Sequence, residues 1–220
     1  MKRIIFLAAI AAAFCSAIPV SANAAGTNGN EVYAGVGTLG GTLGYGYALG
    51  EHSAVRVEGN YLDYSRSLSS SSEKYRGKLK LGTIGAYYDL FFAGPFRVTG
   101  GLLFGSNNFS GDVVANGGTV TINHQRYSAA GQSAHVGVKF PSVSPYLGLG
   151  WGHRPERGGL GFFGDIGVAY GSPTATLSVS NGLQVAAGSA NIAAEQSSLQ
   201  NDANKLKFYP VLRVGLDYQF

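Results

Sequence analysis

The last eleven residues alternate between two kinds of side chain, and this alternation constrains the fold more than any other feature. From Pro210 to Phe220 every second residue is apolar, and the residues between them are mostly small or polar, including Arg213 and Asp217. A two-residue period indicates a β-strand with two different faces. In a soluble sheet the charged face would meet water, whereas in a membrane barrel the apolar face meets lipid and the charged face meets the lumen.

The same alternation recurs in earlier segments and predicts a series of strands. Both ends of a membrane barrel lie on the periplasmic side, so the number of strands must be even. The count is about eight if residues 31–49 are split in two and residues 136–151 form one strand, and about ten if these segments are kept separate and residues 174–180 are added. We favour eight because several long loops share the chain. The expected extended segments are residues 31–49, 54–64, 75–91, 96–104, 134–140, 145–153, 160–170 and 210–220.

Composition favours the barrel over a soluble β-sandwich. The 34 glycines, 13 tyrosines and 12 phenylalanines are unusual for a globular domain, and they suit a wall in which Gly relieves crowding in a narrow lumen. After residue 24 no apolar run is long enough for a membrane helix, so a spanning structure must be a closed barrel. We predict an all-β fold, a transmembrane antiparallel up-and-down β-barrel.

The N-terminal residues have the features of a secretory signal. Lys2 and Arg3 precede a short apolar run, and Ala22-Asn23-Ala24 supplies a cleavage site. We expect a cleaved signal peptide at residues 1–24 and one barrel domain at residues 25–220; the alternative is an uncleaved anchor helix. Cys15 is the only cysteine, so the mature chain would have no disulfide or thiol chemistry.

The segment PYLGLGWG at residues 145–152 and the final Phe resemble small bacterial outer-membrane barrels, typified by outer membrane proteins A and W. The closing strand of such barrels ends in Phe after alternate aromatic and apolar residues, here with Tyr218 and Phe220. The resemblance implies a Gram-negative outer membrane, with Tyr218 and Phe220 as a signal for the barrel assembly machinery. It also implies contact with outer-membrane lipids and lipopolysaccharide, and a monomer.

Charged residues on the predicted inward faces are the candidate site. They could line a pore, or they could form an ion-pair network that fills the lumen. An eight-stranded lumen is just wide enough for side chains to fill, and unpaired charges there would be costly. We therefore favour a filled lumen. The residues of this predicted network are Arg56, Glu58, Lys78, Lys80, Arg97, Asp165, Arg213 and Asp217.

Charge and motifs argue against other classes of function. Removing the leader changes the formal charge from +4 to +2 (14 basic minus 12 acidic residues), and the chain lacks a run of Lys or Arg, so we expect no binding to nucleic acid. His52, His124, His135 and His153 lack metal-ligand spacing, so no metal or cofactor is expected.

Enzymatic chemistry has only weak support. Ser180-Asn181-Gly182 weakly resembles the Ser-Asn stretch of outer-membrane lipid A deacylases, whose motif has a His two residues before the Ser. Ser178 stands there instead, so the nucleophile would lack its base. The surrounding insertion, residues 173–206, is expected to hold a short helix over 192–206, either packed on the barrel mouth or as part of a polar loop.

Three functions remain from the sequence. The first is a non-enzymatic barrel with a structural or surface-interaction role. The second is a narrow channel for small or apolar solutes, as the similarity to outer membrane protein W suggests. The third is a lipid-modifying enzyme.

Overall fold

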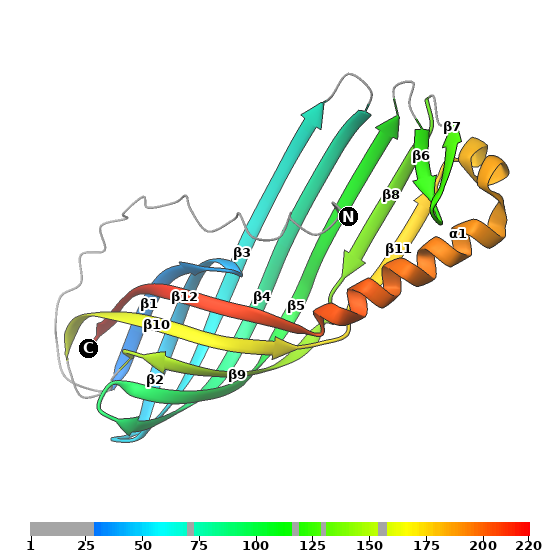
Figure 1. Cartoon of the computed structure of the whole chain (residues 1–220). Coiled ribbons are helices and arrows are strands. Elements are labelled where there is room, and N and C mark those ends of the chain that lie inside the picture. Colours follow the sequence, from blue (N-terminus) through cyan, green and yellow to red (C-terminus); the bar gives the residue numbers. More distant parts are fainter. Residues whose placement is uncertain (1–28, 70–72, 116–118, 129–130, 154–157) are drawn as a thin grey trace.

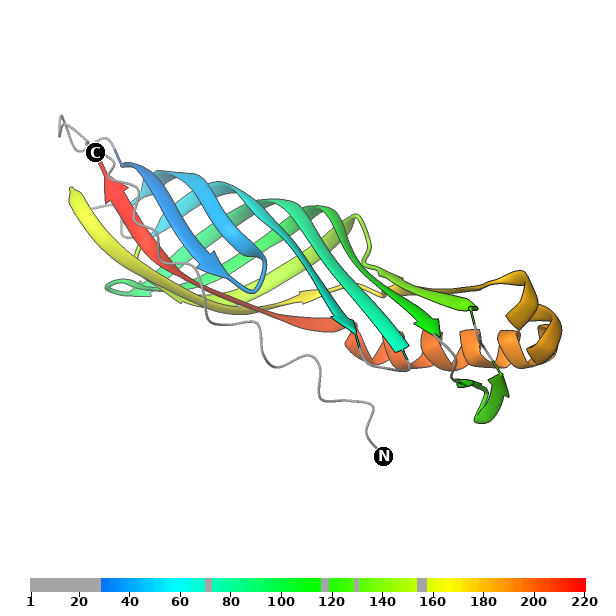
Figure 2. The ribbon, with the colours of Figure 1, turned by 90° about the horizontal axis from the view of Figure 1, so that it is seen from above.

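A closed β-barrel forms one end of the molecule, and a curved sheet extends from part of its rim (Figures 1 and 2). The computed structural model describes residues 29–69, 73–115, 119–128, 131–153 and 158–220. The predicted signal peptide lies outside the described residues. The strands are β1 (Asn30–Gly37), β2 (Gly40–Gly50), β3 (Ser53–Ser69), β4 (Glu73–Ala93), β5 (Phe96–Ala115), β6 (Thr119–Ile122), β7 (Gln125–Ser128), β8 (Ser133–Lys139), β9 (Val143–Trp151), β10 (Gly159–Tyr170), β11 (Thr174–Val179) and β12 (Phe208–Gln219).

The barrel is a ring of eight antiparallel strands, ordered β5-β4-β3-β2-β1-β12-β10-β9. The β5–β9 pairing closes the ring, and the first and last strands lie side by side. Asn30 and Phe220 exchange two backbone hydrogen bonds of 3.3 and 3.0 Å, which join the start of β1 to the C-terminus. The expected eight-stranded up-and-down barrel is confirmed.

The strands differ greatly in length, and this difference creates the extension. Strands β4 and β5 have 21 and 20 residues, whereas β1 has 8. The first half of β5 pairs with β9 inside the ring, and its second half pairs with β8 beyond the ring. Strand β8 in turn pairs with β11, so β3, β4, β5, β8 and β11 continue as an open sheet. The strands expected at residues 54–64 and 75–91 are longer than we predicted, because β3 continues to Ser69 and β4 starts at Glu73.

An apolar band surrounds the ring, as lipid contact requires. Val55, Leu102 and Leu216 are 36 %, 42 % and 44 % exposed, while Arg56, Arg97 and Arg213, on the opposite faces of the same three strands, are at most 1 % exposed. Neighbouring positions of one strand therefore face hydrocarbon and interior in turn. Further outward residues of the band are Val57, Tyr61, Ile84, Tyr88, Leu90, Leu147, Leu149, Leu160, Phe162, Ile166 and Val214.

The helix α1 (Asn181–Ala203), followed by the 3₁₀ turn η1 (Asn204–Leu206), runs beside the extension and returns the chain to β12 (Figure 1). Two glutamines of α1 bind the backbone of β11 as a neighbouring strand would: Gln196 with Ala175 O and Leu177 N, both at 2.6 Å, and Gln200 with Ala175 N and Pro173 O, both at 2.9 Å. The helix thereby provides hydrogen-bond partners for backbone groups at the free edge of β11. No helix in the described part of the chain is long and apolar enough to cross a bilayer.

One expectation for this region was wrong. The helix starts at Asn181 rather than near Ile192, although Gly188 interrupts it with φ 76°. Packing of Leu183 and Ala187 against Ile122 of β6 outweighs the low helix propensity of glycine. Asn116-Gly117-Gly118 also predict a hairpin turn, but these residues lie outside the described ranges; the small hairpin β6–β7 turns at Asn123-His124.

Candidate functional site: the interior of the barrel

Three arginines and three carboxylates meet at mid-height inside the ring. The arginines are on β3, β5 and β12, and the carboxylates are on β3, β4 and β10, so charges from different walls face one another. Each has an apolar, outward-facing neighbour in sequence, and the strand period therefore turns each charge inward. The six residues are Arg56, Arg97, Arg213, Glu58, Asp89 and Asp165, which we call the ionic layer.

Asp89 joins two arginines. Arg56 donates to it through Nε at 2.5 Å and Nη2 at 3.1 Å, and Arg97 Nε lies 3.3 Å from Asp89 Oδ1. Thr99 Oγ1 donates to the same carboxylate at 2.5 Å. Arg97 also donates to Asp165 at 2.5 Å, which links β4, β5 and β10 across the lumen.

Glu58 joins the third arginine to two tyrosines. Arg213 Nη1 donates to Glu58, and the hydroxyls of Tyr33 and Tyr87 donate to it at 3.1 and 2.8 Å. The Arg213 guanidinium also lies 4.8 Å from the centre of the Tyr87 ring, a cation–π distance. The three positive and three negative charges balance, so the layer contains charge without a net excess of one sign.

An apolar layer lies on the extracellular side of these charges. Leu39, in the β1–β2 turn, is only 4 % exposed and packs with Tyr87, Leu103 and Tyr146. Ala169 and Val211 complete this cluster, which we call the apolar layer. Gly40, with φ 101°, lets the short hairpin turn inside the wall, where a Cβ would collide with Tyr61 O.

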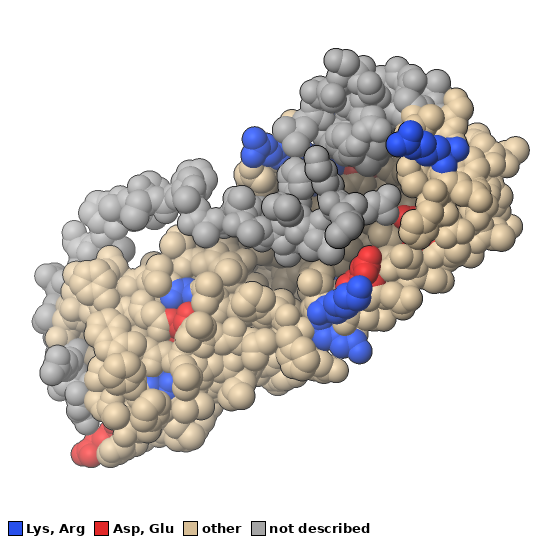
Figure 3. Space-filling view, in the orientation of Figure 1, with Lys and Arg blue, Asp and Glu red and all other residues tan. Residues whose placement is uncertain are grey.

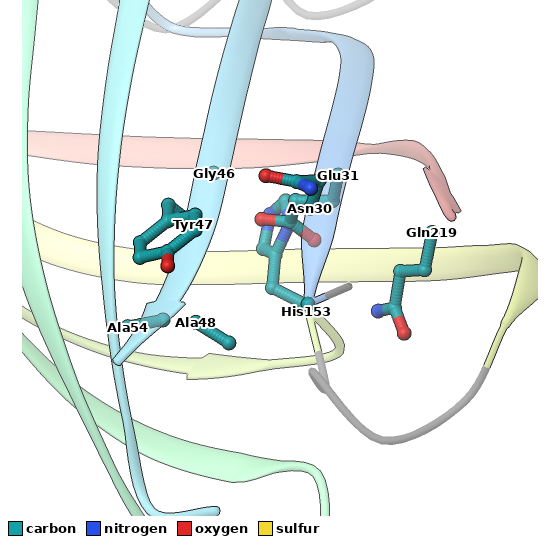
Figure 4. A pocket seen from close by; sticks show the side chains of 9 residues that line it. Asn30, Glu31, Gly46, Tyr47, Ala48, Ala54, His153 and Gln219 are labelled. Atoms are coloured by element: carbon teal, nitrogen blue, oxygen red, sulfur yellow. The ribbon is translucent and has the colours of Figure 1, made fainter. Parts of the chain in front are cut away.

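The periplasmic end of the lumen is also filled. Glu31 Oε1 lies 2.9 Å from Nδ1 of His153, and Figure 4 shows these two side chains together beside β1. The cavity that they line with Tyr47, Ala54 and Gln219 has a volume of about 10 Å³, room for about one water molecule. The pKa of His153, which lies in the turn after β9, is lowered well below its ordinary value by burial and then by nearby arginines, so the ring is neutral at pH 7.

The structure brings together five members of the predicted network: Arg56, Glu58, Arg97, Asp165 and Arg213. Asp217 is buried nearer the periplasmic end, where Gln219 donates to it at 3.1 Å.

Lys78 and Lys80 do not lie in the lumen, which corrects our expectation. Both are exposed on the outward-facing side of β4, beyond the ring, and Lys78 Nζ lies 3.8 Å from Asp63. Outside the membrane the polar side of a strand faces outward to water, so the rule that charged residues face inward no longer holds there.

Sequence reasoning missed Asp89 of the ionic layer, and also Tyr33 and Tyr87, which donate to Glu58 of that layer. Asp89 lies in the run YYDLFF, where both faces of the strand carry aromatic or apolar residues. The only available signal was the short turn between β4 and β5. It brings the two strands together so that Asp89 and Arg97 lie close to each other on neighbouring strands.

The other candidate residues lie apart from one another. His52 and His124 are exposed in turns, and His135 Nδ1 lies 2.6 Å from Asp112 on the extension. Within the described ranges, no three His, Cys, Asp or Glu side chains gather as metal ligands would. Ser180 precedes α1, and its hydroxyl donates to Gln132 at 2.5 Å.

Tyr218 and Phe220 lie on the outward side of β12 next to the terminus. Both are half-buried, and their rings stack with centroids 6.3 Å apart. This position suits an assembly signal, which stays a prediction.

Comparisons with known proteins support the fold. CarO and CarO2 of Acinetobacter baumannii are similar in structure, each with a TM-score of 0.61 and 20% identity; the alignments cover 86% and 87% of this chain, and 97% and 98% of those chains. A major outer membrane protein of Thermus thermophilus gives a TM-score of 0.41 at 18% identity. No family model and no curated protein matches the sequence.

The fold is therefore that of a bacterial outer-membrane β-barrel, with its apolar band in the membrane. The narrower resemblance to outer membrane proteins A and W stays an expectation.

Proposed function

We propose that this protein is a non-conducting, non-enzymatic outer-membrane barrel that anchors an extracellular platform for surface interaction. The platform is the five-strand extension with α1 and the β6–β7 hairpin. Outer-membrane lipids and lipopolysaccharide would surround the barrel, and the barrel assembly machinery would insert it as a monomer.

The observation that carries the proposal is the filling of the lumen at three successive levels. Arg56, Arg97 and Arg213 are at most 1 % exposed and bridge the walls through shared carboxylates. The apolar layer closes the space above them, and Glu31, His153 and Gln219 are buried in the space below, beside a cavity with room for about one water molecule. A hydrated ion crossing this interior would have to separate buried ion pairs, which is costly.

Several features support the platform as the functional part. The extension contains nearly half of β4 and β5, far more chain than a turn between two strands requires. A dedicated helix covers its β11 edge, and a hairpin packs against that helix. An ordered structure of this size outside the membrane suits recognition of a partner rather than passage of a solute through the barrel.

Conductance of the purified protein in planar lipid bilayers tests the proposal. The wild-type protein should give no discrete channel openings, because each level of the lumen is filled. The alternative, a narrow channel for small solutes, requires discrete openings; reproducible unitary openings in the wild type would overturn the proposed role. Arg213→Ala with Glu58→Ala removes two large side chains at mid-height and should raise leakage, which confirms that the assay detects an opened lumen.

A further inference from the structure

Beyond the ring, the polar and apolar faces of the sheet are interchanged. The outward face, apolar in the membrane, becomes polar: Asp63, Lys80, Asn108 and Lys139 are successive partners across β3, β4, β5 and β8. The face that continues the inner wall becomes apolar. Its residues include Tyr64, Leu79, Phe109, Val136, Val138 and Leu177, which we call the trough.

The trough is open over much of its area. Tyr64 and Phe109 are 41 % and 45 % exposed. A Cβ added to Gly77 or Gly111, paired with each other on this face, would meet nothing within 4 Å. Helix α1 covers the β11 edge, and its apolar contacts reach Val179 near the tip. The space-filling view shows the molecule hollowed between barrel and tip (Figure 3).

The wall beside the trough has a lateral gap. Strand β2 pairs with β3 only as far as Tyr61, and β1 with its turn residue Thr38 bonds to β12 only as far as Pro210. Above the β1–β2 turn, β3 and β12 are therefore separated by the width of two missing strands, about 14 Å between strand axes. The outward residues of β3 change from Tyr61 to Asp63 at this height, so the gap lies at the outer surface of the membrane.

The floor of the trough is closed. Phe140 and Tyr209 pack edge to face with ring centroids 5.3 Å apart, next to the apolar layer. A molecule that enters from the side can therefore bind in the trough without reaching the ionic layer.

We propose that the trough binds the acyl chain of a single-chain anionic amphiphile, such as a long-chain fatty acid, taken from the outer leaflet through the lateral gap. The trough is continuous with the lipid-facing surface at the gap, and an uncovered apolar face of this kind marks a binding surface. Arg66 lies on the same face, opposite Gly77 and exposed, four residues beyond Leu62. The apolar stretch below its guanidinium is thus about 13 Å long, with a positive charge at its outer end.

Photolabelling of the full chain in nanodiscs of zwitterionic phospholipid tests this proposal, which deepens the proposed surface-interaction role. The probe is palmitic acid with a diazirine in mid-chain, and modified residues are located by mass spectrometry. Labels should appear at trough residues such as Leu79 and Phe109, besides the membrane band, and unlabelled oleate should displace them. Adjacent outward residues such as Lys80 and Asn108 should stay unlabelled.

Matched variants separate binding from misfolding, with the heat-dependent gel shift of each variant as the folding check. Phe109→Gln should lower trough labelling about tenfold, and Asn108→Gln should leave it unchanged. Gly111→Trp should lower it by filling the trough, because open space surrounds this position. Arg66→Gln should weaken labelling by the acid but not by the matching alcohol, whereas Arg76→Gln, on the polar face, should affect neither.

Equal labelling of both faces, labelling confined to the membrane band, or trough labelling unchanged by Phe109→Gln would overturn the proposal. An absence of trough labels, in a protein that a bifunctional reagent cross-links into dimers through the β3 edge, would assign the surface to a second copy and would also overturn it. Bilayer conductance is measured separately from photolabelling. An absence of trough labelling would therefore not contradict the proposed sealed lumen, and channel openings with intact trough labelling would refute only the sealed lumen.

Discussion

Replacing Arg213 by Met should be among the most damaging single changes in the barrel. Its side chain is fully buried, and it is the charged hydrogen-bond partner of Glu58, whose other donors are the neutral Tyr33, Tyr87 and Asn60. Asp165 loses a weaker contact of 3.5 Å but keeps Arg97 at 2.5 Å. The change thus leaves one buried carboxylate without a countercharge, which costs about 3–5 kcal/mol of unfolding free energy.

Urea unfolding in lipid vesicles, followed by the gel shift between folded and unfolded protein, measures this cost. Adding Glu58→Gln removes the stranded charge, so the double variant should be more stable than Arg213→Met alone. Lys78→Met is the matched control: its ion pair with Asp63 is 52% and 35% exposed, and its loss should cost less than about 1 kcal/mol. A cost below that of the control, or a double variant whose loss equals the sum of the single losses, would refute a coupled ionic layer.

Three further changes probe other parts of the molecule. Val214→Lys puts a charge on the lipid face and should cost about 2–4 kcal/mol of unfolding free energy in the same titration. Gly215→Ala should also lose stability, but through crowding in the interior, because its Cβ would lie 2.5 Å from Phe163. Only the cost at position 214 should depend on the thickness of the lipid bilayer, so an equal dependence in the two variants would contradict the assigned faces. Gln196→Ala with Gln200→Ala should speed hydrogen exchange at Ala175 and Leu177 without changing the ring; unchanged exchange at both amides would show that α1 does not hold this edge. Ser180→Ala should leave lipid A unchanged in mass spectra of the outer membrane, and a loss of any lipid A modification would favour the lipid-modifying enzyme.

The sequence contained enough information for the ring. Alternation around Arg56 and Arg213 assigned their faces, because the apolar residues beside them have to meet lipid. The eight-strand solution required residues 31–49 to fold back on themselves, and the turn at Thr38-Leu39 does this.

The parts that depend on tertiary contacts could not be predicted. Lys78 and Lys80 follow the same alternation as the ring, but the position of the membrane boundary decides which face takes the charge. Helix α1 contains Gly182 and Gly188 and forms because Leu183 packs against the distant Ile122. Asp89 is placed by pairing with β3 and β5, which no local pattern specifies.

Tryptophan fluorescence at two adjacent positions tests most directly whether the wall separates lipid from a sealed interior. With Trp151→Phe as background, Leu147→Trp places the probe at a site 61 % exposed, and Tyr146→Trp places it at a site 4 % exposed. We expect brominated lipids to quench the probe at 147 alone, and iodide in water to quench neither. Iodide quenching of the probe at 146 would reveal a water-filled lumen, and quenching of that probe by brominated lipid would show that the faces are reversed.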